Sequence, residues 1–376
     1  MKQLLKSLFS VRDRPRLNGE YLLSLFFSVF LALALGAVII LLTGKDPLKG
    51  YAALLNGALG SPRAIGNTLA RSATLCLTGL AMAVAAQAGI FNVGGEGQLY
   101  LGGMAAAIVG YTLKGASPFI AVPLAFLAAI LAGGLYAYIP AVLKVKRNVS
   151  EVITTIMLNS VAIYFCIYLA TGPLKTTEKG IASGTPAIDP SFVFSKLIPL
   201  SNLTQGILYA AGLAIICWYL MTRTTWGYEM KLTGSNSRFA RHMGIPAGRL
   251  SIYAMMFSGA LCGIVGLMEV YGIHRRYVET LSTGFYFDGM LVAMIMRYRP
   301  LGIVLMSLFF GALKIGSSAM ELNMGISSEL VLIVQSIIIF FMAAQGGIAR
   351  NFREKRERRH ARKALSIRKE EEGFAP

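Results

Sequence analysis

The sequence predicts an all-α fold, a polytopic transmembrane bundle of about ten helices. Of its 376 residues, 55% are hydrophobic and 14% are charged, whereas a soluble globular domain carries about 25% charged residues. The apolar residues form long blocks, and several blocks reach the roughly 20 residues that one helix needs to cross a bilayer. The basic residues gather at the N-terminus, in a few loops and in the tail, which is the pattern of membrane orientation.

The apolar blocks place the expected helices in order along a transmembrane domain that covers 21–349. The first block is too long for a signal-peptide core and lacks a small-x-small cleavage site before Thr43, so we expect it to remain as the first helix. The eighth block is short, and Gly284, Gly289 and Pro300 favour a broken or re-entrant element there. The expected segments are 21–42, 67–87, 93–111, 118–142, 152–171, 206–222, 251–271, 284–296, 301–320 and 330–348.

Alternating crossings agree with the positive-inside rule. The basic segment 1–20 places the N-terminus in the cytoplasm, and the last crossing returns the charged tail, 350–376, to the same side. We interpret the tail as an extension that is solvated or contacts lipid headgroups. One basic loop, 272–283 with Arg275 and Arg276, falls on the outer side, against the rule. The basic loops on the cytoplasmic side are 143–151, 223–250 and the turn with Arg297 and Arg299.

The residue types exclude several functional classes. The four cysteines lie in apolar blocks without CxxC spacing, so neither a disulfide framework nor a metal site is expected. The three histidines join no carboxylate or cysteine in metal-ligand or triad spacing, so we expect no catalytic residues, no cofactor and no enzyme. The net charge of +18 follows the membrane pattern and does not predict a nucleic-acid partner. No phosphate loop is found, because Gly44-Lys45 is followed by Asp46 and lacks the upstream glycine.

The most informative stretch runs from Gly89 to Gly103 and reads GIFNVGGEGQLYLGG. Asn92, Glu96 and Gln98 bring polar groups into an apolar region, where a carboxylate is costly unless it is paired or hydrated. These residues favour a pathway-lining or gate element, and Glu96 is equally expected to cap the helix that it opens. Asp288 lies between glycines at the start of another block, so the two segments mark either paired halves of a transport core or a coincidence.

Polar residues also interrupt apolar blocks further along the chain, at Asn159, Glu269, Lys314 and Gln335. Such residues face the interior of a bundle or each other. We assign Asn159 to the pathway and Gln335 to interhelical hydrogen bonding.

The run Phe285-Tyr-Phe287 has two interpretations. Phe285 and its neighbours offer rings on which a nucleobase stacks. Their expected position near the outer interface instead favours an aromatic belt.

The stretch Phe91-Asn-Val-Gly-Gly-Glu-Gly-Gln98 resembles the signature of permeases in the branched-chain amino acid and monosaccharide ABC importer superfamily, within its nucleoside branch, which is related to the simple-sugar permeases. The resemblance covers about 65–350. The run Met296-Arg-Tyr-Arg-Pro departs from it, because the family more often has a glycine before the arginine, and this leaves the end of the short eighth element open. The other matching stretches, in order, are Ser150–Asn159, Gly234–Gly244, Gly284–Gly289 and Pro300–Ile303.

The resemblance implies a permease subunit in the bacterial inner membrane, with a separate ABC ATPase and an external substrate-binding protein as partners. Partner permeases of this branch usually carry another signature at Phe91–Gln98, so a heterodimer is expected. The implied substrate is a nucleoside, with ribose or another simple sugar as the alternative. The pathway residues that we expect are Asn92, Glu96, Gln98, Asn159, Phe285 and Asp288.

The loop 223–250 is long and, by resemblance, holds the coupling helix that docks in a groove of the ATPase. A helix is expected within Tyr228–Met243, with a break at Gly234 and a closing Gly244. An ordinary positive-inside loop is the alternative. The residues expected to contact the ATPase are Tyr228, Gly234, Arg238, Arg241 and Gly244.

Two rival classes remain. An ion-coupled secondary transporter works alone and needs an ion-binding carboxylate, for which Glu96 or Asp288 qualifies. A membrane-embedded enzyme is disfavoured by the spacing of the histidines.

Overall fold

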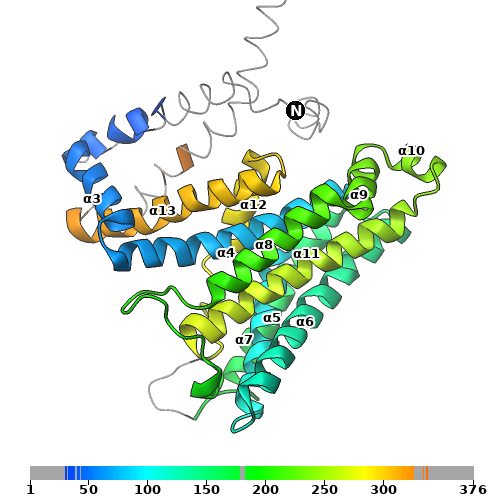
Figure 1. Cartoon of the computed structure of the whole chain (residues 1–376), viewed down its shortest axis with the longest axis horizontal. Helices are drawn as coiled ribbons and strands as arrows, with labels where there is room; N and C mark the ends of the chain where they lie inside the picture. Colours follow the sequence, from blue (N-terminus) through cyan, green and yellow to red (C-terminus); the bar gives the residue numbers. More distant parts are fainter. Residues whose placement is uncertain are drawn as a thin grey trace, which may run out of the picture. The chain divides into compact units, whose positions relative to one another are not determined.

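The computed structural model describes residues 30–31, 33–38, 40–42, 44–177, 183–325, 333 and 336–337. The chain divides into two compact units, Met1–Tyr51 with Glu321–Pro376, and Ala52–Met320. The described elements are α3 (Pro47–Leu59), α4 (Pro62–Gln87), α5 (Gly95–Thr112), α6 (Pro118–Arg147), α7 (Glu151–Thr171), η1 (Pro190–Phe192), α8 (Gly206–Arg223), α9 (Thr225–Ser235), α10 (Ser237–His242), α11 (Ala247–Glu269), η2 (Val270–His274), α12 (Phe285–Ile295) and α13 (Pro300–Met324) (Figure 1).

The predicted all-α class is confirmed for the described residues, in which extended pairing is limited to two isolated bridges. Within those residues, six helices are long and apolar enough to cross a membrane: α4, α6, α7, α8, α11 with its continuation η2, and α13. The predicted count of about ten is not confirmed. The predicted segment 330–348 and most of 21–42 lie outside the described residues.

The two remaining predicted segments form helices that do not meet that criterion: α12 is too short, and α5 is long enough but not sufficiently apolar. α12 has 11 residues, so it extends about 16 Å along its axis, about half of a bilayer core. This length confirms the short eighth element. α5 has 18 residues and begins with Gly95 and Glu96 inside the protein. α3 was not predicted, because its 13 residues fall in the expected connection between the first two crossings.

Local sequence explains where the helices begin and end. The Ser61 hydroxyl accepts a hydrogen bond from the Ala64 N–H at 3.1 Å, and Pro62 occupies the first turn of α4. Pro118 opens α6, and Asn148 closes it in the left-handed conformation. Gly284, with a φ of +87°, precedes α12.

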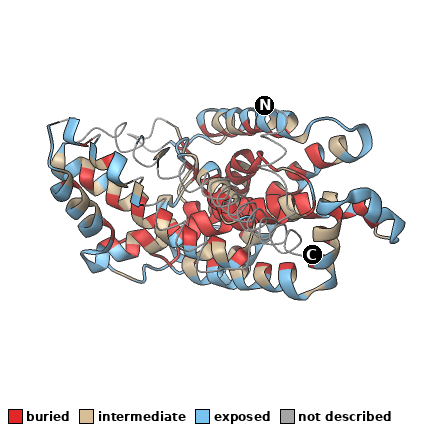
Figure 2. Cartoon of the chain, turned by 90° about the horizontal axis from the view of Figure 1, so that it is seen from above, coloured by how far each residue is buried: buried red, intermediate tan, exposed pale blue. Residues whose placement is uncertain are grey.

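The bundle has an inner and an outer layer of helices. In the most apolar windows of α4 and α11, 78% and 67% of the residues are buried, against 28%, 22% and 22% in α6, α7 and α8. Figure 2 shows this contrast, with buried segments enclosed by helices whose outer faces are exposed. The inner helices therefore position any site, and the outer ones present apolar faces of the kind that lipid covers.

Small residues allow α11 to lie directly against its neighbours. A Cβ atom at Gly263 would overlap backbone of α6, and one at Gly266 would overlap backbone of α5. Gly259 meets the α6 backbone at Gly133 in the same way. Lipid tails are as apolar as the side chains of these helices, so the hydrophobic effect does not drive helices together in a bilayer. Close packing of backbones at small residues does so instead.

The described part of the long loop before α8, 183–205, is held against the connection between η2 and α12. The Thr185 and Ile188 N–H groups donate to the carbonyl oxygens of Tyr277 and Arg275, at 3.1 and 2.9 Å. Asp189 accepts hydrogen bonds from the N–H groups of Ser191 and Gly115, at 2.9 Å each. These hydrogen bonds stabilise the ionised carboxylate and lower the pKa of Asp189 below its ordinary value, and the bond from the Ser191 N–H contributes most.

The loop 223–250, which is predicted to be cytoplasmic, contains two helices, so the predicted single helix with a break at Gly234 is wrong in detail. Gly234 lies inside α9, and the break falls at Asn236. The Asn236 side chain accepts a hydrogen bond from the Phe239 N–H at 3.1 Å and thereby caps α10. Asparagine is a strong N-cap residue, which explains the position of the break.

Candidate functional site

A buried polar network surrounds the broken segment between α4 and α5. The Asn92 Nδ2 donates to Gln98 Oε1 and to Ser258 Oγ, both at 2.9 Å. The Asn92 Oδ1 accepts from the Gly94 N–H at 3.0 Å and from Gln98 Nε2 at 3.2 Å. The three side chains are fully or almost fully buried. The network therefore satisfies polar groups that would otherwise be unpaired inside the bundle.

Asn159 of α7 also binds the segment between α4 and α5, through two hydrogen bonds between its side-chain amide and the backbone. Its Oδ1 accepts from the Gly97 N–H at 2.8 Å, and its Nδ2 donates to the Val93 carbonyl at 2.8 Å. One buried amide thus bridges the backbone on both sides of the α5 start.

The two glycine-flanked segments that open α5 and α12 meet. The Glu96 Oε2 accepts from the Tyr286 N–H at 3.1 Å, in the first turn of α12. The Tyr286 hydroxyl donates to the Asn92 carbonyl, and the Tyr286 ring fills the space that a Cβ at Gly95 would need. Glu96 lies in the first turn of its own helix, as predicted, but its hydrogen bond goes to the N-terminus of another helix, where a negative charge is also favourable.

Four charged side chains lie close together elsewhere in the bundle. The Lys314 Nζ and Asp288 Oδ2 are 2.8 Å apart. Arg71 lies close enough to Glu269 and Asp288 for electrostatic attraction to both. The Arg71 Cζ lies 4.0 Å from the centroid of the Phe285 ring, which is a cation–π contact. We refer to Arg71, Glu269, Phe285, Asp288 and Lys314 as the charged cluster.

Two helices, α4 and α13, bring residues from the middle of their lengths to the charged cluster or its immediate surroundings, whereas Glu269 is the last residue of α11. Thr74, whose hydroxyl donates to Glu269 Oε1 at 3.1 Å, is about 18 Å along the helix axis from the start of α4 and about 20 Å from its end. Lys314 is about 21 Å from the start of α13 and about 15 Å from its end. Substrate sites of transporters built with broken helices occur near the bilayer midplane.

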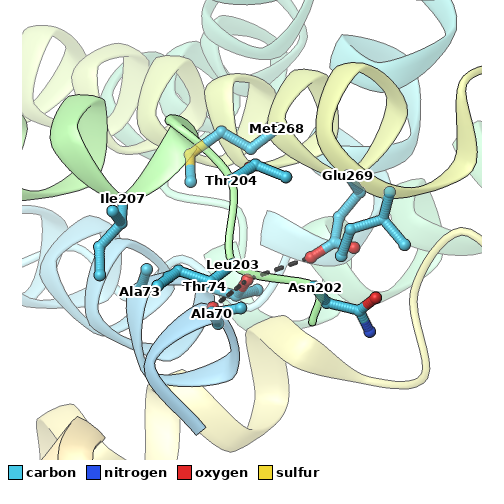
Figure 3. Close-up of a pocket in the computed structure, with 10 residues that line it drawn as sticks. Ala70, Ala73, Thr74, Asn202, Leu203, Thr204, Ile207, Met268 and Glu269 are labelled. Atoms are coloured by element: carbon cyan, nitrogen blue, oxygen red, sulfur yellow. Dashed lines mark hydrogen bonds between the residues drawn. The ribbon is translucent and has the colours of Figure 1, made fainter. Parts of the chain in front are cut away.

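A small pocket opens beside Glu269 and Thr74 (Figure 3). Its walls come from α4, from the end of α11 and from the loop before α8 with the start of that helix. Polar groups reach it from Thr74, Asn202, Thr204 and Glu269, and Met268 supplies part of its apolar wall. The pocket therefore combines a carboxylate with hydroxyl and amide groups on an apolar background, as ligand sites do.

The backbone around this pocket is irregular. α11 changes at Glu269 into the π turn η2, Val270–His274. Leu200, in the loop before α8, has a φ of +61°, which is uncommon outside glycine. π turns inside helices are frequent at functional sites.

The structure places all six predicted pathway residues in two groups. Asn92, Glu96, Gln98 and Asn159 belong to the polar network. Phe285 and Asp288 belong to the charged cluster, together with Glu269 and Lys314, which the sequence had singled out only as polar interruptions. The aromatic-belt interpretation is wrong for Phe285 and Tyr286, whose side chains are buried among helices.

Sequence reasoning missed Arg71 and Thr74. The signal for Arg71 was available, since an arginine inside a long apolar block is as unusual as a carboxylate there. No signal pointed to Thr74, because threonines that bond to their own helix are common, and only the fold places this one beside Glu269.

The predicted coupling residues lie at the end of the bundle where α4 ends and α11 begins. Tyr228 is exposed on α9, and Arg238 and Arg241 are exposed on α10. Gly244, with a φ of +81°, is exposed in the turn that follows. A Cβ at Gly234 would overlap the backbone of Gln87, so α9 lies directly on the end of α4.

Two exposed apolar side chains, Phe239 and Met243, accompany these residues and were not predicted. They give the outer face of α10 and the following turn a mixed basic and apolar character.

Comparison with known proteins gives one matching family, described as branched-chain amino acid transport system / permease component, over residues 64–343. A guanosine ABC transporter permease protein of Bacillus subtilis (strain 168) is 35% identical over 332 residues, which cover 88% of this chain and 95% of that protein. A nucleoside ABC transporter permease protein of Lactococcus lactis subsp. cremoris (strain MG1363) is 33% identical over 322 residues, 83% of this chain and 87% of that protein. A glucose ABC transporter permease protein of Haloferax volcanii is 31% identical over 325 residues, 84% of this chain and 85% of that protein. No solved structure matches the chain.

Proposed function

Because the chain belongs to the family of branched-chain amino acid transport permease components, we propose that it is the membrane-spanning permease of an ABC importer for nucleosides. It forms the translocation pathway, and separate subunits hydrolyse ATP. The observation that carries this proposal is the charged cluster, which brings charged and aromatic groups from α4, α11, α12 and α13 together inside the bundle, where ionisable residues of membrane proteins mark transport pathways. The guanosine and nucleoside permeases among its relatives support the substrate class.

The pathway residues have two proposed roles. Phe285 and Asp288 face the cargo at the charged cluster. Asn92, Glu96, Gln98 and Asn159 hold the broken segment that closes the pathway on the cytoplasmic side, where their hydrogen bonds fix its backbone.

The ATPase contact is proposed at α9, α10 and the turn that ends at Gly244. An amphipathic helix that lies in a groove of the partner passes nucleotide-driven movement to the membrane. The contact of Gly234 with the α4 end supports this role, because a displacement of α9 then reaches an inner helix directly. The proposed contact residues are Tyr228, Gly234, Arg238, Arg241 and Gly244.

The remaining partners follow from the same function. We propose a second, different permease subunit, an external binding protein that delivers the nucleoside, and surrounding lipid. We propose that the chain lies in the bacterial inner membrane with both termini in the cytoplasm, which the positions of its basic segments favour.

A simple sugar is the second candidate substrate, since one relative is a glucose permease. The proposal is tested by uptake of radiolabelled guanosine and ribose into cells that lack this chain, compared with the same cells after its return. Restored guanosine uptake that is lost when the phosphate loop of the co-expressed ATPase is mutated is the expected result. Restored ribose uptake alone would assign the sugar, and uptake that ignores the ATPase but ends with the proton gradient would assign a secondary transporter.

A further inference from the structure

Glu269 has unused hydrogen-bonding capacity in an enclosed position. Its side chain is buried, with 4% of the residue exposed. Among the described residues, its carboxylate accepts one hydrogen bond, from the Thr74 hydroxyl to Oε1. An ionised carboxylate has two acceptor oxygens with about four lone-pair sites. A buried carboxylate is normally satisfied more fully than this, so the remaining sites are available to a ligand.

The surroundings of Glu269 fix its position. Thr74 holds Oε1 from α4, and Arg71 provides the opposing charge from one turn earlier on the same helix. The carboxylate lies in the wall of the pocket, which Asn202 and Thr204 from the loop before α8 also line (Figure 3). A carboxylate held in a fixed position discriminates among ligands by the number and arrangement of their hydrogen-bond donors.

The nucleobases differ in what they offer to a carboxylate. Guanine carries two adjacent donors, N1–H and the N2 amino group, on one edge, whereas adenine and cytosine place an amino donor beside a ring nitrogen acceptor. Uracil has one donor between two carbonyl acceptors. Only guanine can therefore donate two parallel hydrogen bonds to one carboxylate, and charge-assisted paired bonds of this kind are strong and geometrically specific.

We propose that Glu269 is the residue that makes this permease select guanine nucleosides. Its carboxylate accepts hydrogen bonds from N1–H and the N2 amino group, with Thr74 holding Oε1 and Arg71 balancing the charge. This inference rests on the proposed nucleoside transport. In the present conformation the pocket holds no more than a few water molecules, so the base is received in a more open state of the transport cycle.

The first test compares Glu269→Gln with the unaltered complex, with the same binding protein and ATPase in both. The amide replaces one acceptor oxygen by a donor, so the ratio of guanosine to adenosine uptake is expected to fall at least about fivefold, which is the lower limit of the discrimination that one good bidentate pair provides. The selectivity of the binding protein cancels from this comparison, because the same binding protein delivers the nucleosides to the variant and to the unaltered complex. The matched control is Glu151→Gln, which removes a carboxylate from an ion pair with Lys144 at the start of α7 and should leave the ratio unchanged.

An unchanged ratio in an assembled Glu269→Gln complex that still imports guanosine would remove the inference and leave the proposed function intact. An unaltered complex that imports ribose and no nucleoside would refute the proposed function itself.

A second test does not depend on the folding of a variant. The binding protein is saturated in turn with 1-methylguanosine, which lacks the N1–H donor, and with 7-deazaguanosine, which keeps both donors. The unaltered complex should transport the 1-methyl compound at least tenfold more slowly, and equal rates would overturn the assignment.

Discussion

Asn159 shows how much of the broken segment depends on one side chain. Its amide satisfies the Gly97 N–H and the Val93 carbonyl, which lie on either side of the α5 start. Backbone groups at the start of a helix lack the hydrogen-bond partners that a preceding helical turn would provide. The Val93 carbonyl and the Gly97 N–H are in this position, because α4 has ended and α5 is beginning. The shape of the segment is therefore fixed by a residue from a different helix, α7.

Replacing Asn159 by alanine is expected to destabilise the protein. Each buried backbone group left without a partner costs about 1–3 kcal/mol, so the thermal unfolding midpoint in detergent should fall clearly. Asn56→Ala is the matched control, because Asn56 is exposed on α3 and should be nearly neutral. A variant at position 159 that unfolds at the same temperature as this control would contradict the structural role of the amide.

Sequence alone identified the polar residues but not their partners. Glu96 and Asn92 stood out because they interrupt apolar sequence, whereas the Tyr286 N–H that Glu96 binds lies 190 positions further along the chain. A contact at that separation is set by the fold. The same reason explains why Glu269 was noticed and Thr74 was not.

At the level of helices, the closest contacts of the bundle run along α11. The Gly263 Cα faces backbone of α6 with no room for a side chain. Gly263→Ala is therefore expected to force α6 and α11 apart and to reduce the yield of monodisperse protein after detergent extraction.

Gly212 provides the comparison. It lies in α8 with open space where a Cβ would be, so Gly212→Ala should preserve the yield and even stabilise α8 by up to about 1 kcal/mol. Size-exclusion profiles of the two variants, measured side by side, check both expectations. Equal profiles would contradict the prediction that the close α6–α11 contact determines the yield of monodisperse protein.

Sequence predicted the helices well where length and apolarity were sufficient. It failed where a short side-chain interaction decided a boundary, as at Asn236, which caps α10 and moves the break away from Gly234. It also failed for α3, whose 13 residues are too few to be recognised as a crossing.

At the level of the whole molecule, all four cysteines are buried in the bundle. Maleimide labelling of the unaltered protein is therefore expected to be weak, which makes introduced thiols informative. Ser237→Cys on α10 should react with a membrane-impermeant maleimide only in permeabilised cells, whereas Lys114→Cys, in the turn after α5, should react in intact cells. Reaction of both in intact cells would refute the proposed orientation.

The proposed ATPase contact gives a further expectation for transport. Phe239, half-exposed on α10, is proposed to enter the groove of the partner, so Phe239→Ala should lower uptake severalfold and weaken co-purification of the ATPase. Phe119→Ala is the control. That ring is more exposed than Phe239, at 91% against 50%, but it lies at the opposite end of the spanning helices. Equal uptake in the two variants would argue against docking at α10.

The charged cluster also determines how the transporter responds to voltage. In their ionised forms, Arg71 and Lys314 balance Glu269 and Asp288, so the four residues together then carry no net charge, and a nucleoside adds none. Moving one elementary charge across a membrane is worth about 2.3 kcal/mol per 100 mV, but a neutral site with a neutral cargo experiences no such force. Uptake into proteoliposomes should therefore be the same at every potential set with valinomycin and potassium, whereas Lys314→Met should make it voltage-dependent. A cell whose membrane has been depolarised would keep its supply of nucleosides as long as it keeps its ATP.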